Sequence, residues 1–396
     1  MRTQRQLFLE LLGQTSPDPL LLEVERAHGV FLYTPEGKAV IDLISGVSVS
    51  NLGHTHKKVV AAATEQLQKY MHIMVYGEVV QTPQVQLAEL VLSLLPDSFS
   101  SLYLVNSGSE AVEGALKLAK RVTGRSKIVS TINAYHGSTH GALSVLGCDE
   151  YKSNFQPLLP NVSFMRYNEL EDIHCIDEQT ACVIVEPIQS EAGIIVPTLH
   201  YLEKLREKCT ETGALLIFDE VQNGFGRIGK MFAFEHFNVV PDILCFAKGM
   251  GGGMPIGAFA ASKAHMDSFT SNPVLGHITT FGGHPVSSAA AYACVKELVE
   301  NKEIIQSISQ KEMLFRNLLQ NHPKVRSIRG KGLFLAVELD APKQVHALMR
   351  KALEHGVLLD FFLFCDTHFR IAPPLIISEQ EISMACKQIC AALDEL

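Results

Sequence analysis

The feature that most constrains this chain is an alternation of short apolar runs with amphipathic helical runs, from about Thr82 to about Ser288. The apolar runs that read as strands are SLYLVN, KIVSTI, ACVIVEP, ALLIFDE and DILCFAK. Helical stretches such as SEAVEGALKLAKRVTG and LHYLEKLREKCTETG lie between them. Apolar strands separated by helices are typical of a mainly parallel sheet with both faces covered. The pattern therefore predicts an α/β fold.

The two ends of the chain have a different pattern. Residues 21–45 read as short strands with a turn at 35–37, and after about Tyr292 helical stretches mix with isolated strands such as FRIAPPL. A chain of 396 residues is too long for one ordinary core. We predict a large central domain at 46–294 and a small α+β domain built from 1–45 and 295–396.

Composition excludes several classes of partner. The net charge of −8 gives no reason to expect nucleic acid or an anionic membrane surface. No apolar run approaches the roughly 18 residues of a membrane span, and the first residues do not form a secretory signal. The nine cysteines are scattered without a CxxC pair, as in reduced thiols of a cytoplasmic protein. We expect no metal site.

Polar residues follow several predicted strands, where ligands of open parallel sheets bind. The turn at 106–109 precedes a helix, so its free N–H groups suit an anion, although taken alone a simple helix cap is the more common explanation. The segment NAYHG at 133–137 could cover a planar ligand or pack as a loop. Asp219, at the end of ALLIFDE, could bind a metal, a ribose or a cationic ring nitrogen.

Lys248 ends the apolar run DILCFAK and is followed by Gly249 and by glycines at 251–253. A partly desolvated lysine has a lowered pKa and attacks carbonyls, and glycines let the backbone approach a bulky ligand. A P-loop does not fit, because the lysine precedes the glycines. An anion cradle, an aromatic ring, a carboxylate and such a lysine together meet the needs of pyridoxal phosphate.

With these parts in place, the chain resembles the class III pyridoxal-phosphate aminotransferases of fold type I, especially the acetylornithine and ornithine aminotransferase group. The resemblance spans nearly the whole chain. Its motifs, in order, are SGVSVSNLGHTHKKVV, NSGSEAVEGALKLAK, AYHG, VIVEPIQSEAGI, LLIFDEVQNGFGRIGK, AKGMGGGMPIGAF, TTFGGHPVSSAAA and RIAPPLIIS.

The resemblance implies a role for each matching residue. Lys248 would form the Schiff base with the cofactor and shuttle the proton, and Asp219 would pair with the ring nitrogen. Thr280 would complete the phosphate site of a neighbouring subunit, which implies a homodimer with shared active sites. The other expected cofactor-site residues are Ser107, Gly108 and Ser109 near the phosphate, Tyr135 and Val221 on the two ring faces, Gln222 at the ring hydroxyl, His136, and Glu186 near Asp219.

The resemblance also places the substrate. Arg370 would pair with a substrate carboxylate, and Glu191 would shield that arginine while an ω-amine reacts. Two positions depart from the family pattern. Ser138 stands where an arginine would bind a second carboxylate, and Ser190 stands where glycine is common. Tyr76 and its loop are candidates for shaping the same pocket.

The predicted function is therefore an aminotransferase with ping-pong kinetics. It would move an amino group from an acetylornithine-like or ornithine-like amino acid, or an ω-amine, to a 2-oxo acid such as 2-oxoglutarate. An aminomutase, a racemase or a decarboxylase would use the same cradle but would not require a 2-oxo acid. A nucleotide-binding module would use the glycine-rich turns and would be colourless.

Overall fold

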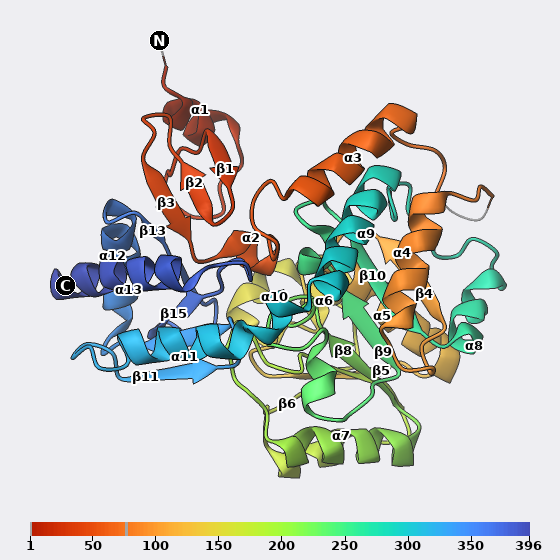
Figure 1. Cartoon of the computed structure of the whole chain (residues 1–396). Coiled ribbons are helices and arrows are strands. Elements are labelled where there is room, and N and C mark those ends of the chain that lie inside the picture. Colours follow the sequence, from red (N-terminus) through yellow and green to blue (C-terminus); the bar gives the residue numbers. More distant parts are fainter. Residues whose placement is uncertain (1, 76–77) are drawn as a thin grey trace.

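The computed structural model describes residues 2–75 and 78–396, and its centre is a seven-stranded sheet (Figure 1). The strand order is β4 (Ser101–Val105), β10 (Gly257–Ala261), β9 (Ile243–Phe246), β8 (Leu215–Asp219), β7 (Thr180–Val185), β5 (Lys127–Thr131) and β6 (Val162–Met165). The pairs from β9 to β6 are parallel, whereas β10 is antiparallel to both of its neighbours. The mainly parallel sheet is confirmed. Strands β6 and β10 were not among the expected runs.

Helices cover the sheet on both faces, because its strands are apolar on both sides and must be buried on both. Helix α5 packs on β10 and β9, and α7 packs on β7 and β8. Helices α3, α4 and α9 pack together, with α4 also against β4. The bounds of these helices are α3 (Lys57–Lys69), α4 (Thr82–Ser93), α5 (Gly108–Thr123), α7 (Leu199–Thr212) and α9 (Pro285–Glu300).

Two smaller sheets combine the two ends of the chain. In the first, β13 (Val357–Leu358) pairs in parallel with β3 (Ala39–Asp42), next to β2 (Phe31–Tyr33) and β1 (Arg26–His28). The second has the order β11 (Ser327–Gly330), β12 (Leu335–Glu338), β15 (His368–Ile371) and β14 (Asp360–Phe361). In Figure 1 the first and last parts of the chain lie together, beside the central sheet. The domain limits proposed from the sequence stay a prediction.

The remaining helices are short or belong to the chain ends. They are α1 (Gln4–Leu11), α2 (Ser45–Ser48), α6 (His140–Ser144), α8 (Lys263–Met266), α10 (Lys302–Gln306), α11 (Ile308–Leu319), α12 (Pro342–Glu354) and α13 (Glu379–Asp394). Within residues 2–75 and 78–396, no helix is long and apolar enough to cross a membrane.

Candidate active site

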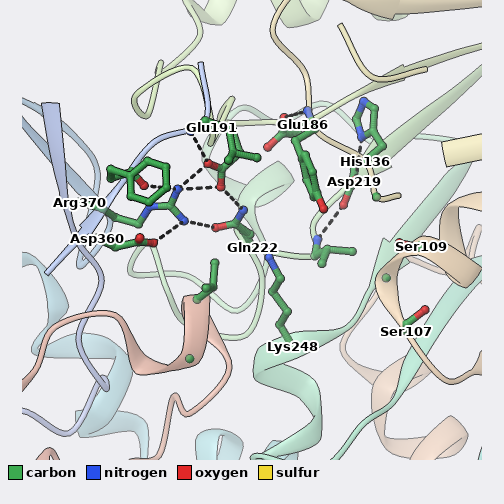
Figure 2. A pocket seen from close by; sticks show the side chains of 18 residues that line it. Ser107, Ser109, His136, Glu186, Glu191, Asp219, Gln222, Lys248, Asp360 and Arg370 are labelled. Atoms are coloured by element: carbon green, nitrogen blue, oxygen red, sulfur yellow. Dashed lines mark hydrogen bonds and ion pairs between the residues drawn. The ribbon is translucent and has the colours of Figure 1, made fainter. Parts of the chain in front are cut away.

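A cavity of about 480 Å³ lies where the central sheet meets the second small sheet. Figure 2 shows its side chains converging from the ends of the central strands, from the start of a helix and from the second small sheet. The predicted residues that line it are Ser107, Gly108, Ser109, Tyr135, His136, Glu186, Glu191, Asp219, Val221, Gln222, Lys248 and Arg370. The cavity is also lined by Gly137, from the segment NAYHG, and by five residues that had no role in the sequence-based prediction: Gly46, Val47, Asp360, Phe361 and Leu363.

The start of α5 forms one wall of the cavity. Ser107 is the N-cap, and α5 begins at Gly108, inside the turn expected at 106–109. The Ser107 hydroxyl accepts from Glu110 N at 3.2 Å. First-turn N–H groups have no partner inside a helix and favour an anion. A Cβ at Gly108 would lie 2.9 Å from Val221 Cγ1, so only glycine lets the two segments approach this closely.

Asp219 and His136 form a buried pair between β8 and the loop after β5. Asp219 Oδ2 lies 2.7 Å from His136 Nδ1, and Asp219 Oδ1 accepts from Val221 N at 3.0 Å. Their side chains are 5% and 0% exposed. The partners fix the carboxylate in one orientation, as a buried charge requires. The other ring nitrogen of His136, Nε2, has no hydrogen-bond partner in the part of the chain that the structure describes.

Lys248 begins the short turn that follows β9, in a left-handed backbone conformation with φ of 45°. Its amine forms no hydrogen bond or ion pair with any described residue, and Figure 2 shows its side chain rising into the cavity. Burial lowers the pKa of this amine to about 8. Gly249 is required next to it, because a Cβ there would lie 2.4 Å from the Asn51 side chain. A free, partly neutral amine is therefore held at the cavity floor.

Glu186 and Ser190 lie deeper in the wall. Glu186 Oε1 accepts from Tyr135 N at 3.2 Å, and Oε2 accepts from Ser190 N at 2.9 Å and from the Ser190 hydroxyl. Burial raises the pKa of Glu186 to about 7. Gln222 Nε2 donates to Ser190 Oγ at 3.2 Å, so the chain of hydrogen bonds continues toward the opposite end of the cavity.

Arg370 and Glu191 form a buried ion pair at that opposite end. Arg370 Nη2 lies 2.7 Å from each carboxylate oxygen of Glu191. Arg370 Nη1 donates to Gln222 Oε1 at 3.4 Å, and Gln222 Nε2 donates to Glu191 Oε1 at 3.2 Å. Although burial opposes it, the guanidinium lowers the pKa of Glu191. At one end of the site, Glu191 neutralises the charge of Arg370. The amine of Lys248, which has no partner among the described residues, lies nearer the start of α5 (Figure 2).

Two residues singled out in the sequence lie elsewhere. Thr280 is exposed, in a separate hollow that it shares with Met74, Leu275 and Ile278. Ser138 is exposed, and its N–H donates to Ser109 Oγ at 3.4 Å. Tyr76 lies outside the described residues.

Comparison with known proteins agrees with this geometry. The family model of class-III aminotransferases matches residues 13–393. An acetylornithine aminotransferase of Methanopyrus kandleri is 38% identical over 369 residues, which cover 92% of this chain and 92% of that protein. The structure of an ornithine aminotransferase from Toxoplasma gondii, with PLP at partial occupancy, matches with a TM-score of 0.90. That match has 28% identity and covers 98% of this chain and 92% of that one.

A further solved structure is that of an ω transaminase from Pseudomonas jessenii in complex with PMP. It matches with a TM-score of 0.90 and 26% identity, over 100% of this chain and 98% of that chain. The fold is therefore that of a transaminase that uses pyridoxal phosphate. The chain belongs to the class-III aminotransferases.

Proposed function

We propose that this transaminase moves the amino group of an ornithine-like or acetylornithine-like amino acid, or of an ω-amine, to a 2-oxo acid such as 2-oxoglutarate. The observation that carries the proposal is the shared cavity: Lys248, Asp219 and Arg370 all line it. A relative that acts on acetylornithine and a structural neighbour that acts on ornithine support this class of donor.

The residues present fit the cofactor. The N–H groups at the start of α5, with Ser107 and Ser109, suit a phosphate. Asp219, fixed by His136 and the N–H of Val221, suits a protonated ring nitrogen. Tyr135 and Val221 would contact the ring, Gln222 its hydroxyl, and Lys248 its aldehyde. When bound, pyridoxal phosphate withdraws electrons from the carbon that carries the amino group.

Lys248 would move the proton. Its pKa of about 8 leaves a substantial neutral fraction near neutral pH, so the amine can both accept a proton from the substrate carbon and return it. Glu186 is buried near Asp219, and with a pKa of about 7 it would be partly protonated near neutral pH. The negative charge beside Asp219 would therefore depend on the protonation of Glu186.

Arg370 would distinguish the two substrates. A 2-oxo acid carries a carboxylate that can displace Glu191 and take the guanidinium by a pair of hydrogen bonds. A donor without a carboxylate next to its reacting carbon leaves Glu191 in place. The same cavity can then accept both substrates in turn.

The active unit would be a homodimer. Thr280 lies outside the cavity of its own chain, in a hollow with exposed apolar side chains. Met74, Leu275 and Ile278 are 54%, 56% and 58% exposed. Exposed apolar side chains that gather on one face mark an interface. A second copy covering this face would bring Thr280 to the partner's phosphate site.

The test is spectroscopic and chemical. The purified protein supplied with pyridoxal phosphate should be yellow, and borohydride should fix the cofactor mass on the peptide that contains Lys248. An amine donor should change the absorbance, and a 2-oxo acid should restore it. If borohydride labels another lysine, or if the amine causes no change that a 2-oxo acid reverses, the proposal is wrong.

A further inference from the structure

Asp360 is a charged side chain of the cavity that the reaction described above does not use. It lies on β14, directly opposite Arg370 of β15 in the antiparallel register, so both side chains emerge on the same face. Its Oδ2 is 3.8 Å from Arg370 Nη1, and Figure 2 shows the two side chains pointing toward the same space. Asp360 also lines the cavity.

The charges at this end of the cavity do not balance. Arg370 is already held by both oxygens of Glu191, and Asp360 adds a second carboxylate. With Lys248 assigned to the cofactor, the substrate end carries one positive and two negative charges. Ser138 adds no positive charge where the family pattern has an arginine.

The Asp360 carboxylate can also accept more hydrogen bonds than it receives from the described residues. Across residues 2–75 and 78–396, no side chain donates a hydrogen bond to Asp360, because Arg370 Nη1 at 3.8 Å is too distant. The backbone N–H of Phe361 supplies a hydrogen bond, whereas an ionised carboxylate has about four acceptor sites. The Asp360 side chain is only 22% exposed, and burial raises the pKa of Asp360, opposed by Arg370 and raised further by Glu191. A cation placed in the cavity would offset the desolvation of this group.

We propose that Asp360 is a specificity-determining residue that binds the second ammonium group of a diamine donor. The inference rests on the proposed transaminase function. In this arrangement Glu191 stays on Arg370 while one amine of the donor reacts and the other donates to Asp360. The inference therefore narrows the proposed donors to ω-amines with a distal ammonium group, because an ornithine-like or acetylornithine-like amino acid would bring a distal carboxylate to two acids and no free cation. Asp360 also weakens the binding of the 2-oxo acid, whose carboxylate must approach Arg370 beside it.

The experiment compares three donors that each have four carbons and the same reacting primary amine: putrescine, butylamine and γ-aminobutyrate. Their distal groups are positive, neutral and negative. Each is mixed with the holoenzyme, and the absorbance change gives an apparent dissociation constant and a rate. The variants are Asp360→Asn and, as the matched control, Asp366→Asn, which removes an exposed carboxylate from the turn between the same two strands.

We expect the unchanged chain to bind putrescine about tenfold more tightly than butylamine, and γ-aminobutyrate most weakly, because one charge-assisted hydrogen bond is worth about that factor. Asp360→Asn should raise the dissociation constant of putrescine to that of butylamine and lower the dissociation constant of the 2-oxo acid severalfold. Asp366→Asn should keep the original order. A general disturbance of the site would weaken all ligands and could not tighten the 2-oxo acid.

The inference is overturned if the unchanged chain does not prefer putrescine to butylamine, or if Asp360→Asn leaves that preference intact. These outcomes differ from a failure of the proposed function, in which none of the three amines changes the absorbance reversibly.

Discussion

The guanidinium of Arg370 lies 2.7 Å from both oxygens of Glu191, and the two side chains are 1% and 6% exposed. A buried pair of this kind stabilises little by itself, but removing one partner leaves an uncompensated charge. Any substrate that takes the arginine must therefore supply an anion of its own. The pair therefore makes the substrate end of the cavity selective for a group that carries a negative charge, while the cavity itself stays open.

Replacing Glu191 by glutamine should change the two half-reactions in opposite directions. The neutral amide holds Arg370 less strongly, so the dissociation constant of a 2-oxo acid should fall about tenfold. Amine donors without a carboxylate should react more slowly, because the guanidinium then keeps only the more distant Asp360, at 3.8 Å, as a counter-charge. Single-turnover absorbance with each substrate measures both effects. Glu203→Gln, at an exposed site of α7, is the control. Equal changes for the two substrates would contradict the prediction.

The pKa of Lys248 can be read in the protein without cofactor. Burial lowers it from 10.5 to about 8, so the amine should react with an acylating reagent with half-maximal rate near pH 8. Lys204 is an internal control, because its hydrogen bond to Glu207 raises its pKa. Peptide mass spectrometry after brief labelling measures both residues in one sample. Labelling of Lys248 only above about pH 10 would contradict the predicted desolvation.

The lowered pKa of Lys248 should also make the stability of the protein depend on pH. The folded protein holds fewer protons on Lys248 than the unfolded chain between about pH 8 and pH 10.5. The free energy of unfolding of the cofactor-free protein should therefore rise with pH across that window, by the contribution of this group. Lys248→Met should remove this contribution to the slope.

Most of the cofactor end of the site could be predicted from the sequence, because its residues are local. Ser107 and Gly108 follow a strand and begin a helix, Asp219 ends β8, and Lys248 follows β9 by two residues. In a parallel sheet such strand ends meet at one edge, so position along the chain is enough to bring them together.

The rest depends on contacts distant in sequence. Strand β10 has the sequence GAFAA, which has weak strand propensity, and it forms because it is enclosed between β4 and β9. Asp360 faces Arg370 only through the register of β14 and β15. Val47 reaches the cavity through a left-handed backbone with φ of 62°. An acid within the apolar run LLDFF was the one signal available for Asp360.

If the chain forms the proposed dimer, a charge placed on the apolar hollow around Thr280 should reduce cofactor retention at the active site. Ile278→Asp should shift the protein toward the monomer and speed the loss of pyridoxal phosphate, because Thr280 then no longer reaches its partner. Sedimentation and absorbance after gel filtration measure the two effects. Leu199→Asp, at a similarly exposed apolar site of α7, should change neither. A monomeric unchanged protein that retains its cofactor would contradict the shared site.

Ser138→Arg should place a cation beside Gly137, which lines the cavity. If the missing contact limits binding of a second carboxylate, KM for 2-oxoglutarate or acetylornithine should fall about tenfold, the value of one charge-assisted contact. Putrescine should not gain. Thr139→Arg adds the same charge at the next exposed position and is the control. Equal effects of the two variants would show a general electrostatic attraction instead of a specific contact.

Ser190 links the two ends of the site, and its removal should be visible as a shift in pH dependence. The hydroxyl donates to Glu186 and accepts from Gln222, which in turn contacts both Glu191 and Arg370. Burial raises the pKa of Glu186 to about 7, and the hydrogen bond from Ser190 lowers it. Ser190→Ala removes that donor while keeping the backbone contact, so the pKa of Glu186 should rise further.

The expected result of Ser190→Ala is that the ionisation near pH 7 in the half-reaction profile moves to higher pH, while the fold loses about 1 kcal/mol of stability. Absorbance titration and single-turnover rates from pH 5 to pH 9 measure the shift. In a Glu186→Gln background the same substitution should leave the profile unchanged, because the titrating group is gone. A shift that persists in that background would assign the ionisation to another group, and a shift to lower pH would contradict the donor role of Ser190.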